Sequence, residues 1–103
     1  MKLPKKIKIL GIPYTVKYVN SQLKIGDEDE YLWGQTVYAT ETITIYVNSR
    51  SKKSVWKTLL HEVLHVLFIE FEIENNDKKR EAIVTQLATG LSAIIIDNKF
   101  MEY

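Results

Sequence analysis

The order of strand-like and helix-like segments predicts an α+β fold rather than an alternation of strands and helices. Residues 1–49 hold short runs in which apolar and polar side chains alternate, whereas residues 50–97 hold long runs with helical periodicity. With 103 residues, the chain is long enough for one core of modest size. We therefore expect a single domain, an antiparallel sheet of about three to four strands with mixed pairing at its edge, followed by two packed helices.

The first half of the chain predicts two hairpins. Residues 7–10 and 14–19 alternate apolar and polar side chains, and Gly-Ile-Pro at 11–13 is expected to form the turn between them. Residues 32–38 and 42–47 are rich in Thr, Val, Ile and Tyr, which favours a second pair of strands.

The second half predicts a helical hairpin. Ser51 or Ser54 can cap a helix that runs to about Phe71, residues 75–77 are expected to form a turn, and a second helix follows at residues 78–97. The first helix has a broad apolar face that is expected to cover the sheet, made of Val55, Trp56, Leu59, Leu60, Val63, Val66 and Leu67. Both tryptophans, Trp33 and Trp56, are expected in the core.

The first helix also carries the sequence His61-Glu62-Val63-Leu64-His65, which uses both histidines of the chain. Side chains four residues apart stack on one face of a helix, so both imidazoles can reach one metal ion. Glu62 lies one residue further round, within reach of a water on that metal. This HExxH pattern is typical of zinc peptidases, in which the glutamate is the general base.

A third protein ligand is needed, and it is expected to come from the second helix. The histidines lie on the side of the first helix away from its main apolar face, in the seam between the helices. Glu72 lies too far along the first helix and Glu70 is expected to point toward the sheet, whereas a helical hairpin returns Glu81 to the level of Ile69. We therefore expect His61, His65 and Glu81 to bind Zn²⁺. The predicted segments are a sheet at 1–49, an active-site helix at 50–72 and a third-ligand helix at 77–97.

The second helix is expected to pack on the first through an apolar stripe. This stripe is Ile83, Val84, Leu87, Leu91, Ile94 and Ile95. Gly90 lies within it, at a cost of ~1 kcal/mol relative to alanine. The glycine is expected either to allow a close approach of the two helices or merely to relieve crowding between them.

These residues predict hydrolysis of a protein or peptide substrate. Glu62 would take a proton from a zinc-bound water as that water attacks a peptide carbonyl. An extended substrate can add to an edge strand, and the strand containing Gly34, Gln35 and Thr36 is the expected edge, because a glycine admits a second backbone. A second oxyanion donor would be a tyrosine or a backbone group, and the tyrosine candidates are Tyr31, Tyr38 and Tyr46.

The composition of the chain indicates its cellular compartment and the classes of partner that it does not bind. The chain has no cysteine, which excludes disulfides and thiolate-bound zinc and suits a reducing compartment. The net charge is only +1 and the lysines are scattered, so we expect no binding of nucleic acid. The apolar run at 93–96 is far shorter than the ~20 residues that span a bilayer, so we expect no membrane segment. We expect a cytoplasmic protein. The acidic run at 26–30 is expected to be a solvated loop, since it lacks the spacing of a calcium loop.

The segments around HExxH (Thr58-Leu59-Leu60 before it, and residues 81–91 after it) resemble those of small zincin metallopeptidases of phages and mobile elements, relatives of the ImmA/IrrE-like family. The resemblance covers nearly the whole chain. It implies a minimal zincin-like fold and a gluzincin-like site with Glu81 as third ligand. Because members of the wider family cleave transcriptional repressors, it also implies a repressor, or another phage or host protein, as substrate.

Two other functions compete with the peptidase. The first is a non-catalytic binding module that grips an extended partner through its edge strand. The second is a structural zinc site, which needs no base and fills its fourth position. Glu62 favours catalysis over the second.

Overall fold

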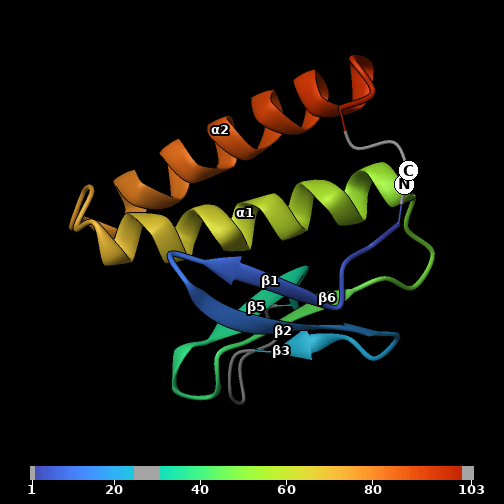
Figure 1. The fold of residues 1–103 in the computed structure, drawn as a ribbon, viewed down its shortest axis with the longest axis horizontal. Coiled ribbons are helices and arrows are strands. Elements are labelled where there is room, and N and C mark those ends of the chain that lie inside the picture. Colours follow the sequence, from blue (N-terminus) through green and yellow to red (C-terminus); the bar gives the residue numbers. More distant parts are fainter. Residues whose placement is uncertain (1, 25–30, 101–103) are drawn as a thin grey trace.

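The computed structural model describes residues 2–24 and 31–100 and shows an α+β domain in three layers (Figure 1). A sheet forms the first layer, helix α1 (Lys52–Glu70) lies across the sheet, and helix α2 (Asp77–Asp97) packs on the far side of α1. The helical hairpin and its position after the strands are therefore as predicted. Within the described residues, no helix is long and apolar enough to cross a membrane.

The main sheet has four strands in the order β1-β2-β6-β5. Its strands are β1 (Lys6–Ile9), β2 (Ile12–Val19), β5 (Gly34–Val37) and β6 (Thr42–Tyr46). The two predicted hairpins, β1–β2 and β5–β6, are both antiparallel. They join through a parallel pairing of β2 with β6, in which Val16 lies beside Ile43. The parallel pair thus lies at the centre of the sheet, and the prediction that placed the mixed pairing at an edge was wrong. The chain reaches the outer strand β5 first and then turns back into β6, which therefore lies beside β2.

The turn of the first hairpin lies earlier than predicted. Leu10 and Gly11 form it, with φ of 53° and 83°, and Ile12 and Pro13 already belong to β2. Positive φ at both central residues is the geometry of a two-residue type I′ turn, which matches the twist of the flanking strands. Pro13 lies opposite Lys8 of β1, and β6 pairs with β2 only from Thr15 onward. A proline therefore fits this strand position, because none of the described strands lies on its other side.

The predicted strand at 32–38 is divided in the structure. Tyr31 and Leu32 form β4, which pairs with β3 (Leu23–Lys24), and β5 starts at Gly34. Tyr38 belongs to a short 3-10 turn, Tyr38–Thr40, that leads into β6. Among the described strands, none pairs with the outer edge of β5, so the predicted edge strand is confirmed. The acidic run at 26–30 lies outside the described residues.

The core lies between the sheet and α1. The buried side chains are Ile9, Tyr14, Val16, Ile43 and Ile45 from the sheet, with Val55, Trp56, Leu59 and Val66 from α1. Val63 and Leu67 pack against this cluster from the rim. The predicted sheet-facing side of α1 is confirmed in these positions. Ser51 caps the helix, since its side chain accepts a hydrogen bond from the Ser54 N–H at 3.1 Å.

The predicted apolar stripe of α2 is confirmed at Val84 but was wrong at four of its large residues. Helix α2 meets α1 through the small or short side chains of Val84, Ala88 and Ser92, all buried. The large residues one or two positions away are 38–53% exposed, namely Ile83, Leu87, Leu91 and Ile94. Short side chains let two helix backbones approach, which rotates the larger ones outward.

Two further predictions about packing fail. Trp33 is 60% exposed instead of buried. Its ring stacks on the Arg50 guanidinium at 4.5 Å and lies 6.0 Å from the ring of Tyr46. An alanine methyl at Gly90 would have no neighbour within 4 Å, so this glycine neither admits α1 nor relieves crowding.

Candidate metal centre and cleft

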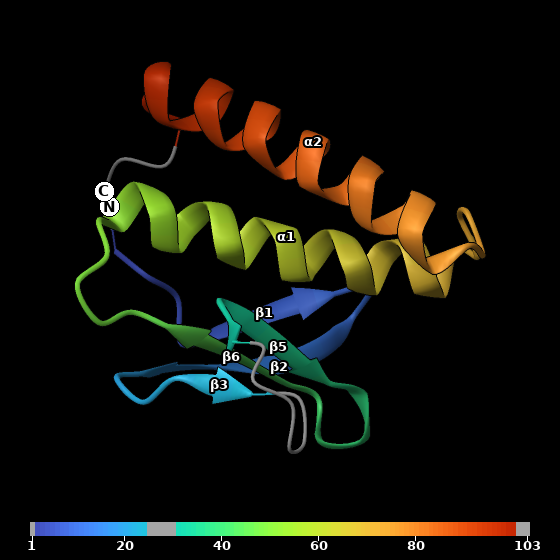
Figure 2. The ribbon, with the colours of Figure 1, turned by 180° about the vertical axis from the view of Figure 1, so that it is seen from behind.

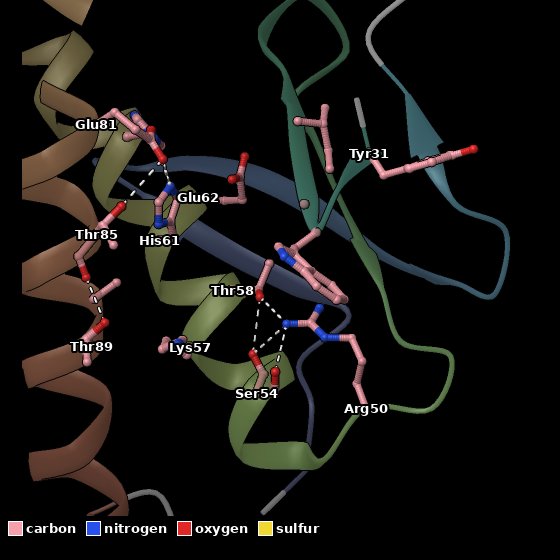
Figure 3. Close-up of a pocket in the computed structure, with 15 residues that line it drawn as sticks. Tyr31, Arg50, Ser54, Lys57, Thr58, His61, Glu62, Glu81, Thr85 and Thr89 are labelled. Carbon is pink, nitrogen blue, oxygen red and sulfur yellow. Dashed lines mark hydrogen bonds and ion pairs between the residues drawn. The ribbon is translucent and has the colours of Figure 1, made fainter. Parts of the chain in front are cut away.

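Three side chains from two helices meet at one point, as the sequence predicts. The Nε2 atoms of His61 and His65 lie 3.1 Å apart. Glu81 reaches them from α2, with Oε1 at 3.0 Å from His61 and Oε2 at 2.6 Å from His65. These are the residues whose donor atoms could hold a metal ion within the described part of the chain. Figure 3 shows His61 directed toward Glu81 across the seam.

The spacing of these atoms fits a tetrahedral zinc site. Two ligand atoms at ~2.0–2.1 Å from a tetrahedral zinc lie about 3.3 Å from each other. The nitrogen pair at 3.1 Å and the His61–Glu81 pair at 3.0 Å are close to this value, and the His65–Glu81 pair at 2.6 Å is shorter. Two imidazoles and one carboxylate form the donor set of several catalytic zinc sites, which leave a fourth position open.

The two helices hold their ligands differently. His61 and His65 stack one turn apart on α1, and their side chains are 22% and 18% exposed. The Glu81 side chain is 55% exposed and lies in the first turns of α2, after the Asn76 cap, whose side chain accepts from the Lys79 N–H at 3.0 Å. The position of Glu81 therefore depends on the helical hairpin.

Glu62 lies outside the three-residue cluster and faces a different side. Its side chain extends from α1 toward β5, whereas His61 points toward α2 (Figure 3). It is only 8% exposed, and its Oε1 accepts a hydrogen bond from Thr36 Oγ1 at 2.8 Å. Burial raises the pKa of Glu62, and the neighbouring Glu81 raises it further, against the lowering effects of the Thr36 bond and His61. A buried carboxylate with a raised pKa is suited to proton transfer.

Gly34 brings the edge strand against this carboxylate. A methyl group there would lie 2.8 Å from Thr58 Cγ2 and 3.2 Å from Glu62 Cγ. The glycine was expected to admit a substrate backbone. In the structure it admits α1, and this contact sets the distance between β5 and Glu62.

The three predicted substrate-binding residues of β5 differ in their positions. The Tyr46 N–H donates to the Trp33 carbonyl at 2.9 Å, and hydrogen-bonded pairs alternate along an antiparallel ladder. The pairs Gly34–Ile45 and Thr36–Ile43 are therefore the pairs without mutual hydrogen bonds. The backbone N–H and C=O groups of Gly34 and Thr36 thus point to the free edge of β5. Gln35 turns its backbone to β6, and of the three residues only Gly34 lines the cleft.

A cleft of about 770 Å³ opens in front of the candidate metal centre. Its floor is α1, one wall is α2, and the other is formed by Tyr31, Leu32, Trp33 and Gly34 (Figure 3). All three candidate ligands and Glu62 line it. The arrangement thus leaves space beside the cluster and the carboxylate for an extended chain.

The part of the cleft near the start of α1 contains residues that the sequence did not single out. Arg50 donates to the Tyr46 carbonyl at 2.6 Å, to Ser54 Oγ at 2.9 Å and to Thr58 Oγ1 at 2.6 Å. Lys57, Thr85 and Thr89 line the same region (Figure 3). Helical spacing could have identified these last three, because Lys57 is four residues before His61 and the threonines are four and eight after Glu81.

The tyrosine candidates for oxyanion binding have unequal positions. Tyr31 lines the cleft, but it is 51% exposed and its side chain extends away from His61 and Glu62 (Figure 3). Tyr38 and Tyr46 do not line the cleft. Burial, with Glu62 nearby, raises the pKa of Tyr38 to about 12, so its hydroxyl stays protonated at neutral pH. Tyr31, the one candidate of the three that lines the cleft, is therefore not directed at the candidate metal centre.

Comparison with known proteins identifies no relative: no family model, no curated protein and no solved structure matches the chain. The function must therefore be argued from the site itself.

Proposed function

We propose that this protein is a zinc-dependent metallopeptidase. The observation that supports this best is the combination of a His61, His65 and Glu81 cluster with a separate, buried Glu62 on the same cleft. The two histidines and Glu81 would hold the ion. When bound, zinc would supply Lewis acidity that polarises a carbonyl and lowers the pKa of a coordinated water.

The side chains of this protein then have distinct tasks. Glu62 accepts the proton of the attacking water and delivers it to the departing amine, and Thr36 holds one of its oxygens by donating a hydrogen bond. Gly34 and Thr36 offer backbone groups at the free edge of β5 to an extended peptide. Burial of Glu62 excludes water from most of its surface, so the proton is transferred within the cleft.

The geometry argues against a structural zinc site. Structural sites are closed by four protein ligands, whereas three donor groups converge here in the described part of the chain. An open cleft also lies beside them. The binding-module alternative shares the edge strand and the cleft, and it differs only in making no use of Glu62. The proposed link to phage and mobile-element peptidases, with a repressor as one candidate substrate, rests on the sequence resemblance alone.

Glu62→Gln separates the peptidase from the binding module. The substitution keeps the size of the side chain and removes the base, so zinc content should stay at one per chain while peptide cleavage falls by a factor of about 10²–10⁴. The assay is digestion of a proteome-derived peptide mixture, read by mass spectrometry, with zinc measured in the same tag-free sample. Equal cleavage by both proteins, or no cleavage by the zinc-loaded wild type, would contradict the proposal.

A further inference from the structure

We infer that the end of the cleft nearest the start of α1 is a carboxylate-binding subsite, with Lys57 as its recognising cation. The inference rests on the proposed function and adds a substrate class, a peptide with an acidic group at a fixed distance from the bond that is cut.

The first observation is the alignment of the two helices. Lys57, His61 and His65 follow each other at intervals of four residues on α1, as do Glu81, Thr85 and Thr89 on the antiparallel α2. Residues at this spacing form a line along one helix face, one turn or about 6 Å apart. All six line the cleft, so the seam that holds the ligands continues past His61 to Lys57 and Thr89.

The second observation is the separation of charge along the cleft. Among the described residues, two acidic side chains line the cleft, Glu62 and Glu81, and both belong to the candidate catalytic centre. The other end contains two cations, Arg50 and Lys57. The cleft is also lined by the hydroxyl groups of Ser54, Thr58, Thr85 and Thr89. In the described part of the chain, the end with the two cations has no carboxylate, which suits an anionic ligand.

The third observation distinguishes the two cations. Arg50 is engaged by the Tyr46 carbonyl, Ser54 and Thr58, and its face is covered by Trp33. Lys57 is exposed and, in the described part of the chain, has no carboxylate within ion-pair distance. Arg50 therefore shapes the subsite and adds positive potential, and Lys57 is free to bind the ligand.

The chemistry fixes the ligand as a carboxylate but leaves two sources in a peptide, the side chain of Asp or Glu and the free C-terminus. A lysine ammonium pairs with either as a point charge. The hydroxyls of Thr58 and Thr89 already donate to backbone carbonyls of the protein, at 3.1 and 2.8 Å, so Lys57 carries the recognition. The two sources differ in where cleavage falls. A side-chain carboxylate selects an acidic residue at one position, whereas a terminal carboxylate selects a fixed distance from the end.

The test compares Lys57→Glu with Lys53→Glu. Lys53 is exposed one turn earlier on α1 and does not line the cleft, so it is the matched control. Zinc-loaded wild type and each variant digest a peptide mixture with free C-termini and the same mixture after C-terminal amidation, and cleavage sites are read by mass spectrometry. We expect acidic residues at one fixed position, or cuts at a fixed distance from the free C-terminus, for wild type and Lys53→Glu. Lys57→Glu should lower this preference by about three- to tenfold.

A preference unchanged in Lys57→Glu, equally lowered in Lys53→Glu, or absent from the wild type would overturn the inference. If zinc-loaded wild type cleaves nothing, the proposed function fails and the subsite is judged by binding. In that case, two synthetic peptides that differ by Glu against Gln are applied to immobilised protein. Stronger retention of the acidic peptide that Lys57→Glu abolishes upholds the subsite, and equal retention overturns it.

Discussion

The two helices contribute to one candidate site from opposite environments. Helix α1 is covered by the sheet on one side and by α2 on the other, as Figures 1 and 2 show from front and back. Helix α2 is covered on one side only, within the described residues, and leaves a row of large apolar side chains exposed. The difference appears in the two glutamates, because Glu62 on α1 is 8% exposed and the Glu81 side chain on α2 is 55% exposed.

This contrast separates the parts of the site that packing fixes from those that a ligand must fix. Leu59 and Val66, both buried, hold α1 on the sheet and thereby place the histidines and Glu62. Glu81 has no such support beyond its ion-pair contacts with the histidines and a distant contact from Thr85 at 3.5 Å. A bound metal would therefore add a link between α2 and α1, and the Glu81 side chain should be less well fixed in the metal-free protein.

Removing a ligand should have the largest effect. Loss of a residue that merely orients a ligand costs ~10–100-fold in metal affinity, so His65→Ala and Glu81→Ala should each cost about 100-fold or more. Zinc affinity is measured by competition with a chromophoric chelator. Glu74→Ala, at a half-buried loop carboxylate outside the cluster, is the control and should bind zinc like the wild type. A Glu81→Ala protein with full affinity would show that α2 takes no part in the site.

Truncating a leucine on each helix tests the difference in burial. Leu59→Ala should lower the free energy of unfolding by about 2–5 kcal/mol, since the side chain has no exposed surface. Leu87→Ala, at a position 41% exposed, should cost about 1 kcal/mol or less. Urea denaturation of both metal-free variants measures this. Equal losses would mean that the outer face of α2 is covered in solution.

The two glycines give the smallest effects, with opposite signs. Gly34→Ala should destabilise the protein by about 1–3 kcal/mol, because the new methyl meets Thr58, which is itself fixed by Arg50. Gly90→Ala meets nothing and should stabilise α2 by up to ~1 kcal/mol. Thermal unfolding of the pair distinguishes the signs. Destabilisation by Gly90→Ala would indicate a contact at that position.

The site was more predictable from the sequence than the packing around it. The meeting of His61, His65 and Glu81 follows from local geometry, the turn of one helix and a short hairpin. The contact face of α2 cannot be predicted in this way. The positions 83, 87 and 91 and the positions 84, 88 and 92 differ by one residue, and helical periodicity fits both.

Long-range contacts explain the other failures. The exposed Trp33 stacks on Arg50, which follows β6 in the chain, and no local pattern predicts such a contact. The parallel pairing of β2 with β6 likewise joins segments that are distant in the chain. The hydrogen bond from Thr36 to Glu62 forms because β5 lies close to α1, and Gly34 permits this close approach. The sequence does not predict this distance.

A crystal structure of the zinc-loaded, tag-free protein, with zinc located by anomalous scattering, tests the central claim most directly. We predict one zinc ion within ~2.2 Å of His61 Nε2, His65 Nε2 and a Glu81 oxygen, with Glu62 facing the cleft and not bound to the ion. An ion coordinated by Glu62 in place of Glu81, or no zinc between the helices, would contradict the account.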